Sequence, residues 1–212
     1  RHRIEIESAK IVAKMAEVLS HEIIELPNCL VSASPLTSNN ELEKYENAEQ
    51  MEAVIGNRVE LTFVPMRNML FLTVAMNRAV ALGCNTLVTG ICQEDNANYP
   101  DCRETFRNSF EVAANEALGT NDLFPGFEIW APLMYLSKAE SVQLATELPG
   151  CMEALAYSHT SYDGKYPPTD MNHANVLRAS GFEKAGVADP LVLRAVEEGL
   201  MDLPLTANYR SL

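Results

Sequence analysis

The sequence has no pair of closely spaced cysteines. Its five cysteines, at positions 29, 84, 92, 102 and 151, lie far apart, and none belongs to a C-x-x-C motif. An odd number of scattered cysteines without a disulfide framework is typical of reduced thiols in a cytosolic protein. We therefore expect a cytoplasmic location.

Positive charge and long hydrophobic runs are also scarce. Lysine and arginine total 16 against 29 aspartate and glutamate residues, giving a net charge of −13. Nonspecific nucleic-acid binding needs basic patches that release counterions, so a direct nucleic-acid partner is not expected, although a nucleotide-sized ligand remains compatible. No apolar run approaches the roughly 20 residues that span a bilayer, and no secretory signal opens the sequence. We expect no membrane association.

What is present is a chain of 212 residues with 47% hydrophobic residues, enough for one sizeable domain or a domain with a small appendage. Hydrophobic periodicity predicts helices at 5–19, 67–82, 103–118, 138–147, 172–179 and 190–200, with Gly83 ending the second and Ser137 capping the fourth. Short β-rich runs predict strands at 86–91 and 127–131, the first of them buried, and extended or strand-like segments at 22–26 and 30–33. Residues 36–60 are polar and predict a surface excursion with at most a short helix, in which 41–52 form a solvated acidic face.

The order of these elements predicts an α/β fold. Strands that alternate with helices indicate a mostly parallel sheet with helices on both faces. From about Tyr157 the chain becomes irregular and then helical. We therefore expect a nucleotide-binding α/β domain at 1–156 and a small helical C-terminal subdomain at 157–212.

The richest segment for chemistry is the loop 95–103, which follows the strand predicted at 86–91. Open α/β sheets bind ligands at the carboxyl ends of their strands. Here Tyr99 can stack on a flat heterocycle, Asp95 or Asp101 can accept ring N–H groups, and Arg103 can pair with a carboxylate or phosphate. The alternative is an ordinary solvated loop in which Asp101 caps the next helix and Arg103 is a surface residue.

Several segments together resemble the 7-cyano-7-deazaguanine synthases, the QueC/ExsB family. The most specific is Tyr-Pro-Asp-Cys-Arg within the loop 95–103; weaker matches follow the family's order over most of the chain. The weaker matches are R-H-x-x-E at 1–5, F-V-P-M-R-N-M-L-F-L at 63–72 with Met66 in place of a glycine, A-P-L at 131–133 with K-A-E at 138–140, and L-R-A-S-G-F at 177–182.

This resemblance implies a PP-loop, or adenine nucleotide α-hydrolase-like, fold and an ATP-dependent reaction that uses Mg²⁺. ATP would adenylate the carboxylate of 7-carboxy-7-deazaguanine, ammonia would displace AMP to give an amide, and a second activation would dehydrate the amide to the nitrile. Adenylation turns a poor electrophile into a good one, so the protein mainly positions reactants and neutralises charge.

The resemblance also assigns roles to individual residues. It implies that Lys138 and Arg67 act in catalysis, and that Arg67, Asn68 and Gly90 bind the nucleotide. The deazaguanine would contact Asp95, Tyr99, Asp101 and Arg103. Cys102 is expected to be a small packed thiol, because adenylation followed by amine attack needs no nucleophilic cysteine.

Two features depart from the family pattern. The phosphate-binding S-G-G-x-D-S loop is absent from the sequence, and we expect it to lie upstream of Arg1. The family's four zinc cysteines align with Ser161, Thr169, Asn172 and Asn175, so no thiolate remains and we expect no zinc. A replacement site built from His159, Asp163, Asp170 and His173 is a less favoured alternative.

Two further functions remain open from the sequence alone. The chain could transfer the activated acyl group to another amine, such as one on a protein partner, or it could be a catalytically dead scaffold subunit. A homodimer or a complex with a protein partner is compatible with either. Products separate the two enzymes, since one gives a free nitrile and the other a protein adduct.

Overall fold

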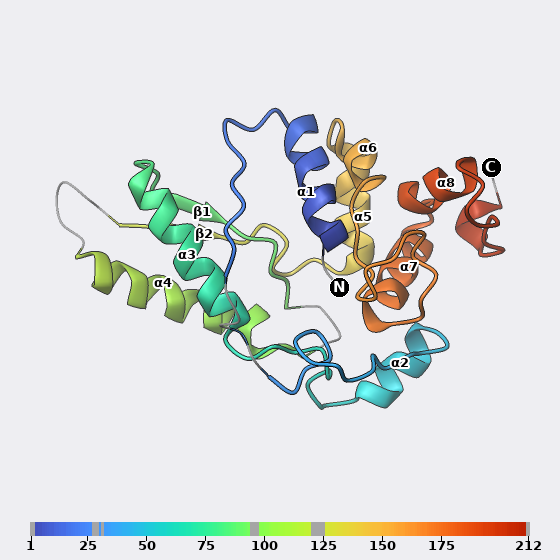
Figure 1. Ribbon diagram of the computed structural model, residues 1–212, viewed down its shortest axis with the longest axis horizontal. Coiled ribbons are helices and arrows are strands. Elements are labelled where there is room, and N and C mark those ends of the chain that lie inside the picture. The colour runs from blue at the N-terminus through green and yellow to red at the C-terminus, as the bar shows by residue number, and fades with distance from the viewer. Residues whose placement is uncertain (1–2, 27–29, 31, 94–97, 120–125, 211–212) are drawn as a thin grey trace.

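The computed structural model describes residues 3–26, 30, 32–93, 98–119 and 126–210. Eight α-helices and two short strands are present in this part of the chain, with brief 3₁₀ turns at Pro100–Cys102 and Ala207–Tyr209 (Figure 1). The elements in chain order are α1 (Arg3–Met15), α2 (Ala48–Ile55), α3 (Arg67–Ala81), β1 (Thr86–Val88), α4 (Glu104–Leu118), β2 (Glu128–Trp130), α5 (Lys138–Glu147), α6 (Cys151–Leu155), α7 (His173–Ala185) and α8 (Pro190–Glu197).

The strands confirm the predicted α/β class and parallel pairing. β1 and β2 pair in parallel, with Leu87 opposite Ile129, and α3 and α4 pack on this pair. The core beneath them contains five buried residues, Leu72, Met76, Phe110, Phe127 and Ile129. The partner residues Val88 and Trp130 are more than half exposed. Within the described chain the helices thus cover one face of this pair, whereas the alternation of elements predicted cover on both.

Local sequence signals explain several helix boundaries. The Ser137 hydroxyl accepts the Glu140 N–H while the Glu140 carboxylate accepts the Ser137 N–H, which is a complete capping box for α5. Gly83 follows α3 with a φ of 70°, a left-handed conformation that glycine adopts without steric cost. Both signals were read correctly from the sequence.

Two local predictions were wrong, and for a third only the strand alternative is excluded, since residues 22–26, 30, 32 and 33 form no strand. β1 is not a buried strand, because Thr86 and Val88 are exposed. The stretch 41–52 is not simply a solvated face, since Tyr45 and Met51 are buried in a second core cluster with Ile55 and Val176.

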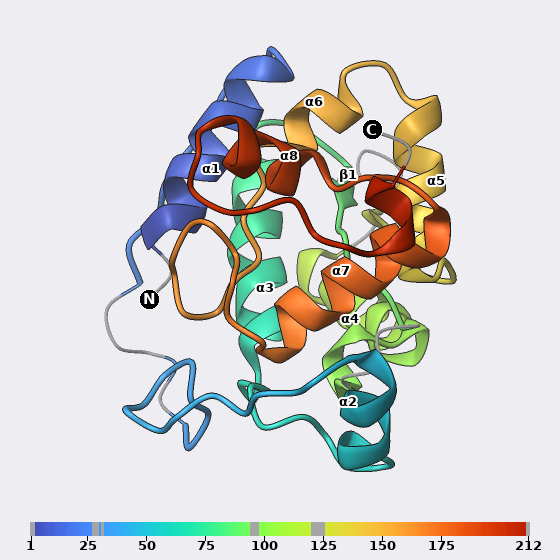
Figure 2. The ribbon, with the colours of Figure 1, turned by 90° about the vertical axis from the view of Figure 1, so that its right-hand side faces the viewer.

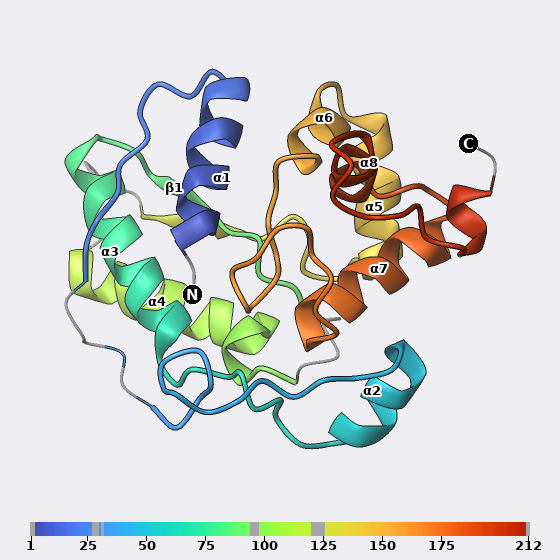
Figure 3. The same ribbon diagram turned by 45° about the vertical axis from the view of Figure 1, so that its right-hand side comes forward.

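Helices α5 and α7 form the most extensive helix contact in the described chain. They cross at Gly181, where an added Cβ would lie 2.8 Å from the Cβ of Lys138. Figure 2 shows α7 crossing the molecule in front of α4, and Figure 3 shows α5 to α8 gathered on the side away from α3. The division at residue 157 remains a prediction; α5, which precedes it, packs mainly on α7, which follows it.

Candidate active site

The loops that follow β1 and β2 run side by side at the carboxyl edge of the strand pair. The Thr89 N–H donates to the Trp130 carbonyl over 2.9 Å, and the Gln93 N–H donates to the Met134 carbonyl over 3.1 Å. The Cys92 thiol donates to the Leu136 carbonyl over 3.0 Å. These bonds connect two segments. One leads into Tyr-Pro-Asp-Cys-Arg at 99–103, which we call the signature, and the other leads into α5 and Lys138.

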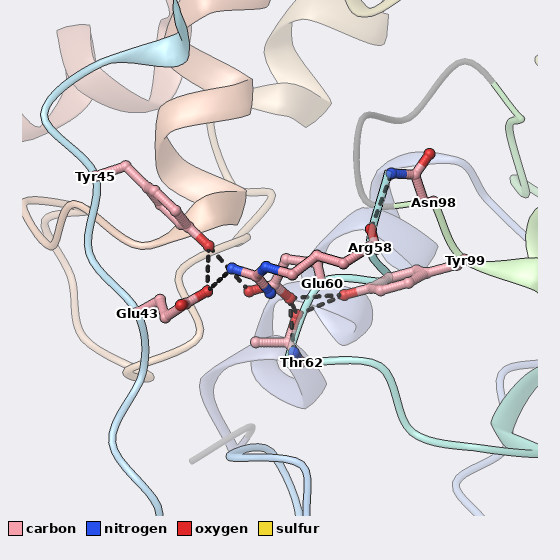
Figure 4. Close-up of polar contacts among 7 residues, drawn as sticks. All are labelled: Glu43, Tyr45, Arg58, Glu60, Thr62, Asn98 and Tyr99. Carbon is pink, nitrogen blue, oxygen red and sulfur yellow. Dashed lines mark hydrogen bonds and ion pairs between the residues drawn. The ribbon is translucent and has the colours of Figure 1, made fainter. Parts of the chain in front are cut away.

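Tyr99, the first residue of the signature, is buried and held by its hydroxyl group. Its oxygen lies 2.5 Å from the Thr62 hydroxyl and donates to Glu60 Oε2 over 3.3 Å (Figure 4). Burial raises the pKa of Tyr99, and the nearby Tyr162 and Glu60 act in the same direction, so the phenol is neutral and keeps its proton to donate. Its ring packs on Phe63, with centroids 5.5 Å apart.

Glu60 links this tyrosine to the polar stretch before α2. Its carboxylate is 1% exposed and accepts hydrogen bonds from the Thr62 N–H over 2.6 Å, from the Thr62 hydroxyl, and from the Tyr45 hydroxyl over 3.3 Å. Tyr45 also donates to Glu43, which forms a 2.6 Å ion pair with Arg58. Burying a carboxylate is costly unless its oxygens accept hydrogen bonds, and here both oxygens do.

The Asp101 side chain lies against the first turn of α3, and it does not cap α4, the next helix in the sequence. It is 7% exposed, and its Oδ2 accepts the backbone N–H of Asn68 over 3.2 Å. The Asn68 side chain returns the contact by donating to the Asp101 carbonyl over 3.0 Å. Met66, the N-cap residue of α3, supplies no side-chain bond, so Asp101 provides this cap from a distant part of the chain.

Arg67 lies between the signature tyrosine and a cavity. Its guanidinium is 5.9 Å from the centroid of the Tyr99 ring, within cation–π range. The cavity, of about 510 Å³, separates α3 from α1 and the chain around Leu36, and Arg67 and Asn68 line it together. Glu5, from the predicted R-H-x-x-E segment, lines the same cavity.

Lys138 lines a second cavity of about 410 Å³ between α5 and α7. Tyr99 lines this cavity as well, so the structure brings these two predicted residues to one space. The other walls are mostly apolar and include Val142, Leu177 and Phe182. Tyr162 lines both cavities.

The other predicted residues that the structure describes, Gly90, Asp101 and Arg103, are not in the lining of either cavity. Arg103 is exposed and is the N-cap residue of α4, where its carbonyl accepts the Arg107 N–H. Gly90 is exposed beyond the end of β1, and a Cβ added there would meet no neighbour within 4 Å. Asp95 lies outside the described residues.

Sequence reasoning missed Glu60, Thr62 and Tyr162. Glu60 and Thr62 stand just before the F-V-P-M-R-N segment, and Tyr162 stands beside the aligned zinc position Ser161. Their closeness to matched segments was the available signal. Their polarity gave no hint that Glu60 and Thr62 are buried or that Tyr162 is partly buried, because the residues that cover them lie far away in the sequence.

The residues aligned with the family's zinc cysteines do not suit zinc. Zinc prefers thiolate and imidazole ligands in tetrahedral sets, whereas these positions carry one serine, one threonine and two asparagines. Thr169 is exposed and apart, while the other three residues hydrogen-bond to one another. Among the described residues, no group of three or more His, Cys, Asp or Glu could hold a metal, so the alternative set around His159 and His173 is not formed there.

The fold and this site together define a class of protein. It is an α/β protein whose signature, residues 99–103, lies beyond the carboxyl edge of parallel strands and beside two cavities. A family model described as "Queuosine biosynthesis protein QueC" matches residues 1–186. The chain belongs to the QueC family.

Individual relatives agree with this assignment. A 7-cyano-7-deazaguanine synthase of Gloeobacter violaceus is 42% identical over 193 residues, which cover 90% of this chain and 80% of the relative. Synthases of the same name from Chromobacterium violaceum and Laribacter hongkongensis are 38% and 39% identical, covering 93% and 92% of this chain and 80% of each relative.

No helix in the described residues is long and apolar enough to cross a membrane.

Proposed function

We propose that this protein converts 7-carboxy-7-deazaguanine to 7-cyano-7-deazaguanine at the expense of ATP. The supporting observation is the similarity to synthases of that product over about nine tenths of the chain, together with an intact Tyr-Pro-Asp-Cys-Arg signature. The protein is then an ATP-dependent ligase that forms a carbon–nitrogen bond. The transfer of an acyl group to a protein amine and the role of dead scaffold have no support from these relatives.

The proposed reaction has two activations. The carboxylate oxygen attacks the α-phosphorus of ATP, pyrophosphate leaves, and ammonia then displaces AMP to give the amide. The amide oxygen then attacks the α-phosphorus of a second ATP and pyrophosphate leaves, and loss of AMP and of both amide protons gives the nitrile. Mg²⁺ would accompany ATP, since it binds the phosphates through their oxygens.

The two cavities suggest how the chain divides the work. We assign the nucleotide to the cavity of Arg67 and Asn68, where a guanidinium and an amide can contact phosphate or base. We assign the deazaguanine to the mostly apolar cavity of Tyr99 and Lys138, which suits a flat ring carrying a carboxylate. Lys138 would then neutralise the carboxylate as it is adenylated.

The proposed roles of the other predicted residues follow from their places. Among the described residues, the contact of Asp101 Oδ1 is with the Cys102 thiol, at 4.0 Å, and we assign to this oxygen a ring N–H of the deazaguanine. Gly90 offers open space for a phosphate to approach the backbone. Asp95 and Arg103 remain proposed contacts of the deazaguanine on the rim, and ammonia is the proposed amine.

Release of AMP tests this function. Protein expressed from its complete coding sequence is expected to release AMP from ATP and Mg²⁺ only when 7-carboxy-7-deazaguanine is added. Lys138→Ala is expected to lower the rate by at least about a hundredfold, as loss of a charge stabiliser does. Lys184→Ala, in the last turn of α7, is the matched control and is expected to leave the rate unchanged. Absence of substrate-dependent AMP would contradict the proposal.

A further inference from the structure

The chain buries a compact set of polar side chains just before α7, at the positions aligned with the family's cysteines. Ser161 is fully buried, and Asn172 and Asn175 are 1% and 7% exposed. The Ser161 hydroxyl donates to Asp163 Oδ1 over 2.7 Å and accepts from Asn172 and Asn175 over 3.3 and 2.7 Å. One donor and two acceptors are all that a hydroxyl offers, so this group is saturated.

The two asparagine amides complete the set. Asn175 Nδ2 donates to the Ser161 hydroxyl and to the Asp170 carbonyl, the latter over 2.8 Å. Asn172 Nδ2 donates to Ser161 and to Asp170 Oδ2 over 2.8 Å, while its oxygen accepts the Asn175 N–H and caps α7. We call Ser161, Asp163, Asp170, Asn172 and Asn175 the amide cluster.

A cation does not fit the centre of the amide cluster. Both amide nitrogens direct N–H donors at the Ser161 oxygen, and a metal there would meet their positive hydrogens. The Asn175 oxygen is buried without a hydrogen-bond partner, but one amide oxygen cannot supply a tetrahedral site. The carboxylate of Asp170 already has a cation, the Lys44 ammonium at 2.8 Å.

Tyr162 follows Ser161 directly and stands where the two cavities meet. It lines the cavity of Arg67 and Asn68 and also the cavity of Tyr99 and Lys138. Burial raises the pKa of Tyr162, and the hydroxyl of Tyr99, which lines the second of these cavities together with it, is close enough to act on that pKa. The amide cluster therefore fixes the backbone on one side of this residue, and Tyr99 meets its side chain on the other.

We propose that hydrogen bonds within the amide cluster replace the metal coordination of the family's cysteine site. They hold Tyr162 in place as the partition between the two cavities. Ser161, Asn172 and Asn175 are positioning residues in this account. Tyr162 separates the proposed nucleotide and deazaguanine spaces and sets how closely their ligands approach. The geometric part stands independently of the proposed function, and the kinetic part rests on it.

Chemical protection of Tyr162 tests the geometric part. In a short pulse of tetranitromethane, followed by peptide mass spectrometry, Tyr162 is expected to stay unmodified while the exposed Tyr135 is nitrated. Prior treatment with a strong chelator is expected to leave this protection unchanged. Asn175→Asp keeps the shape of the side chain but removes both N–H donors. Because two buried hydrogen bonds are lost, local opening around Tyr162 becomes more frequent, and nitration of Tyr162 is expected to rise at least about tenfold.

Ser109→Ala, which removes an exposed hydroxyl on α4, is the matched control and is expected to leave Tyr162 protected. Nitration of Tyr162 after chelation alone, or about one zinc per chain by elemental analysis, would overturn the proposal. So would full protection in Asn175→Asp. Far-ultraviolet circular dichroism identifies a variant that simply unfolds, and Ser161→Ala, which also deprives the cluster of its centre, then replaces it with the same expected nitration.

The kinetic part uses the same variant. Asn175→Asp is expected to raise the KM for 7-carboxy-7-deazaguanine about tenfold with kcat changed less, because the wall of the site is displaced while the reacting groups remain. An unchanged KM in a variant whose Tyr162 is exposed would refute the partition role. If the unmodified protein releases no AMP, the proposed function fails, while the nitration result still decides the geometric part.

Discussion

At the scale of single residues, the buried signature side chains of Tyr99 and Asp101 form hydrogen bonds within the fold, and we propose that each also contacts a ligand. Asp101 gives Oδ2 to the first turn of α3, where an anionic acceptor also interacts well with the helix dipole. Within the described part of the chain, its Oδ1 contacts the Cys102 thiol alone. The Tyr99 hydroxyl contacts Thr62 and Glu60, and the residue also lines the cavity of Lys138.

The substitution Asp101→Asn separates these two roles. The amide oxygen can still accept the Asn68 N–H, so the free energy of unfolding is expected to change by less than about 1 kcal/mol. A ring N–H that met Oδ1 would lose its charged acceptor, and affinity for the deazaguanine is expected to fall about tenfold to several hundredfold. Calorimetric titration and urea unfolding measure the two effects; unchanged affinity would remove Asp101 from the site.

Tyr99→Phe tests the buried bond to Glu60. The variant keeps the ring but leaves Thr62 and the buried carboxylate with one partner fewer, at a cost of about 1–2 kcal/mol. A chain of this size is expected to lose about 2–8 °C in melting temperature. Tyr135→Phe, at a site 57% exposed, is the control and should stay within about 0.5 kcal/mol. Equal stability of the two variants would contradict the account.

At the scale of elements, the crossing of α5 and α7 depends on the absence of a side chain at Gly181. A methyl group there would come within 2.8 Å of the Lys138 Cβ and 3.4 Å of its backbone carbon, and neither atom can move without shifting α5. Lys138 begins α5, so the crossing also sets the position of the proposed catalytic cation.

Gly181→Ala is therefore expected to destabilise the protein by about 1–3 kcal/mol, as overpacking does, although alanine favours helix over glycine by about 1 kcal/mol. The rate of AMP release is expected to fall with it, because Lys138 is displaced. Thermal unfolding gives the first effect and the AMP assay the second. Glu183→Ala, at an exposed position of α7, controls for helix propensity, and a Gly181→Ala protein more stable than the parent would refute the crossing.

Elements with strong local signals could be predicted from the sequence. The helix at 67–82, the capping box at Ser137 and the parallel strands around Leu87 and Ile129 all carry their information within a few residues. The signature loop predicted a site at the carboxyl edge of these strands, and the structure brings Tyr99 and Lys138 to one cavity there.

Burial that depends on distant partners could not be predicted. Glu60 looks like a surface glutamate, but Tyr45 and Tyr99, far from it in sequence, supply donors that make burial tolerable. Tyr45 and Met51 stand in a polar stretch and pack on Val176 of α7. Asp101 was predicted to contact a ligand, with a cap on the next helix as the alternative, and only the tertiary structure shows that it caps α3.

At the scale of the whole molecule, an ion pair joins the polar stretch before α2 to the amide cluster before α7. Burial alone would raise the pKa of Asp170, but hydrogen bonds from Lys44 and Asn172 outweigh it, so this pKa lies below its ordinary value of 3.8. A carboxyl group with a lowered pKa stabilises the folded state above its unfolded pKa. That contribution is lost as pH falls through the folded pKa.

Stability is therefore expected to fall below about pH 4, partly through Asp170. Asp170→Asn should remove this part of the acid dependence and lower stability near neutral pH. Urea unfolding at a series of pH values measures it, with Asp202→Asn as the exposed control. If the free energy of unfolding falls as steeply with decreasing pH in Asp170→Asn as in the parent protein, the ion pair of Lys44 and Asp170 contributes nothing to the acid dependence.

The central claim is that this member of the QueC family makes a nitrile from a carboxylate. Incubation with ATP, Mg²⁺, 7-carboxy-7-deazaguanine and ¹⁵N-ammonium, followed by mass spectrometry of both small molecules and protein, tests it most directly. The account predicts free 7-cyano-7-deazaguanine with the label in its nitrile and AMP as co-product. A deazaguanine adduct on a protein, or ATP left intact with the carboxylate unchanged, would contradict it.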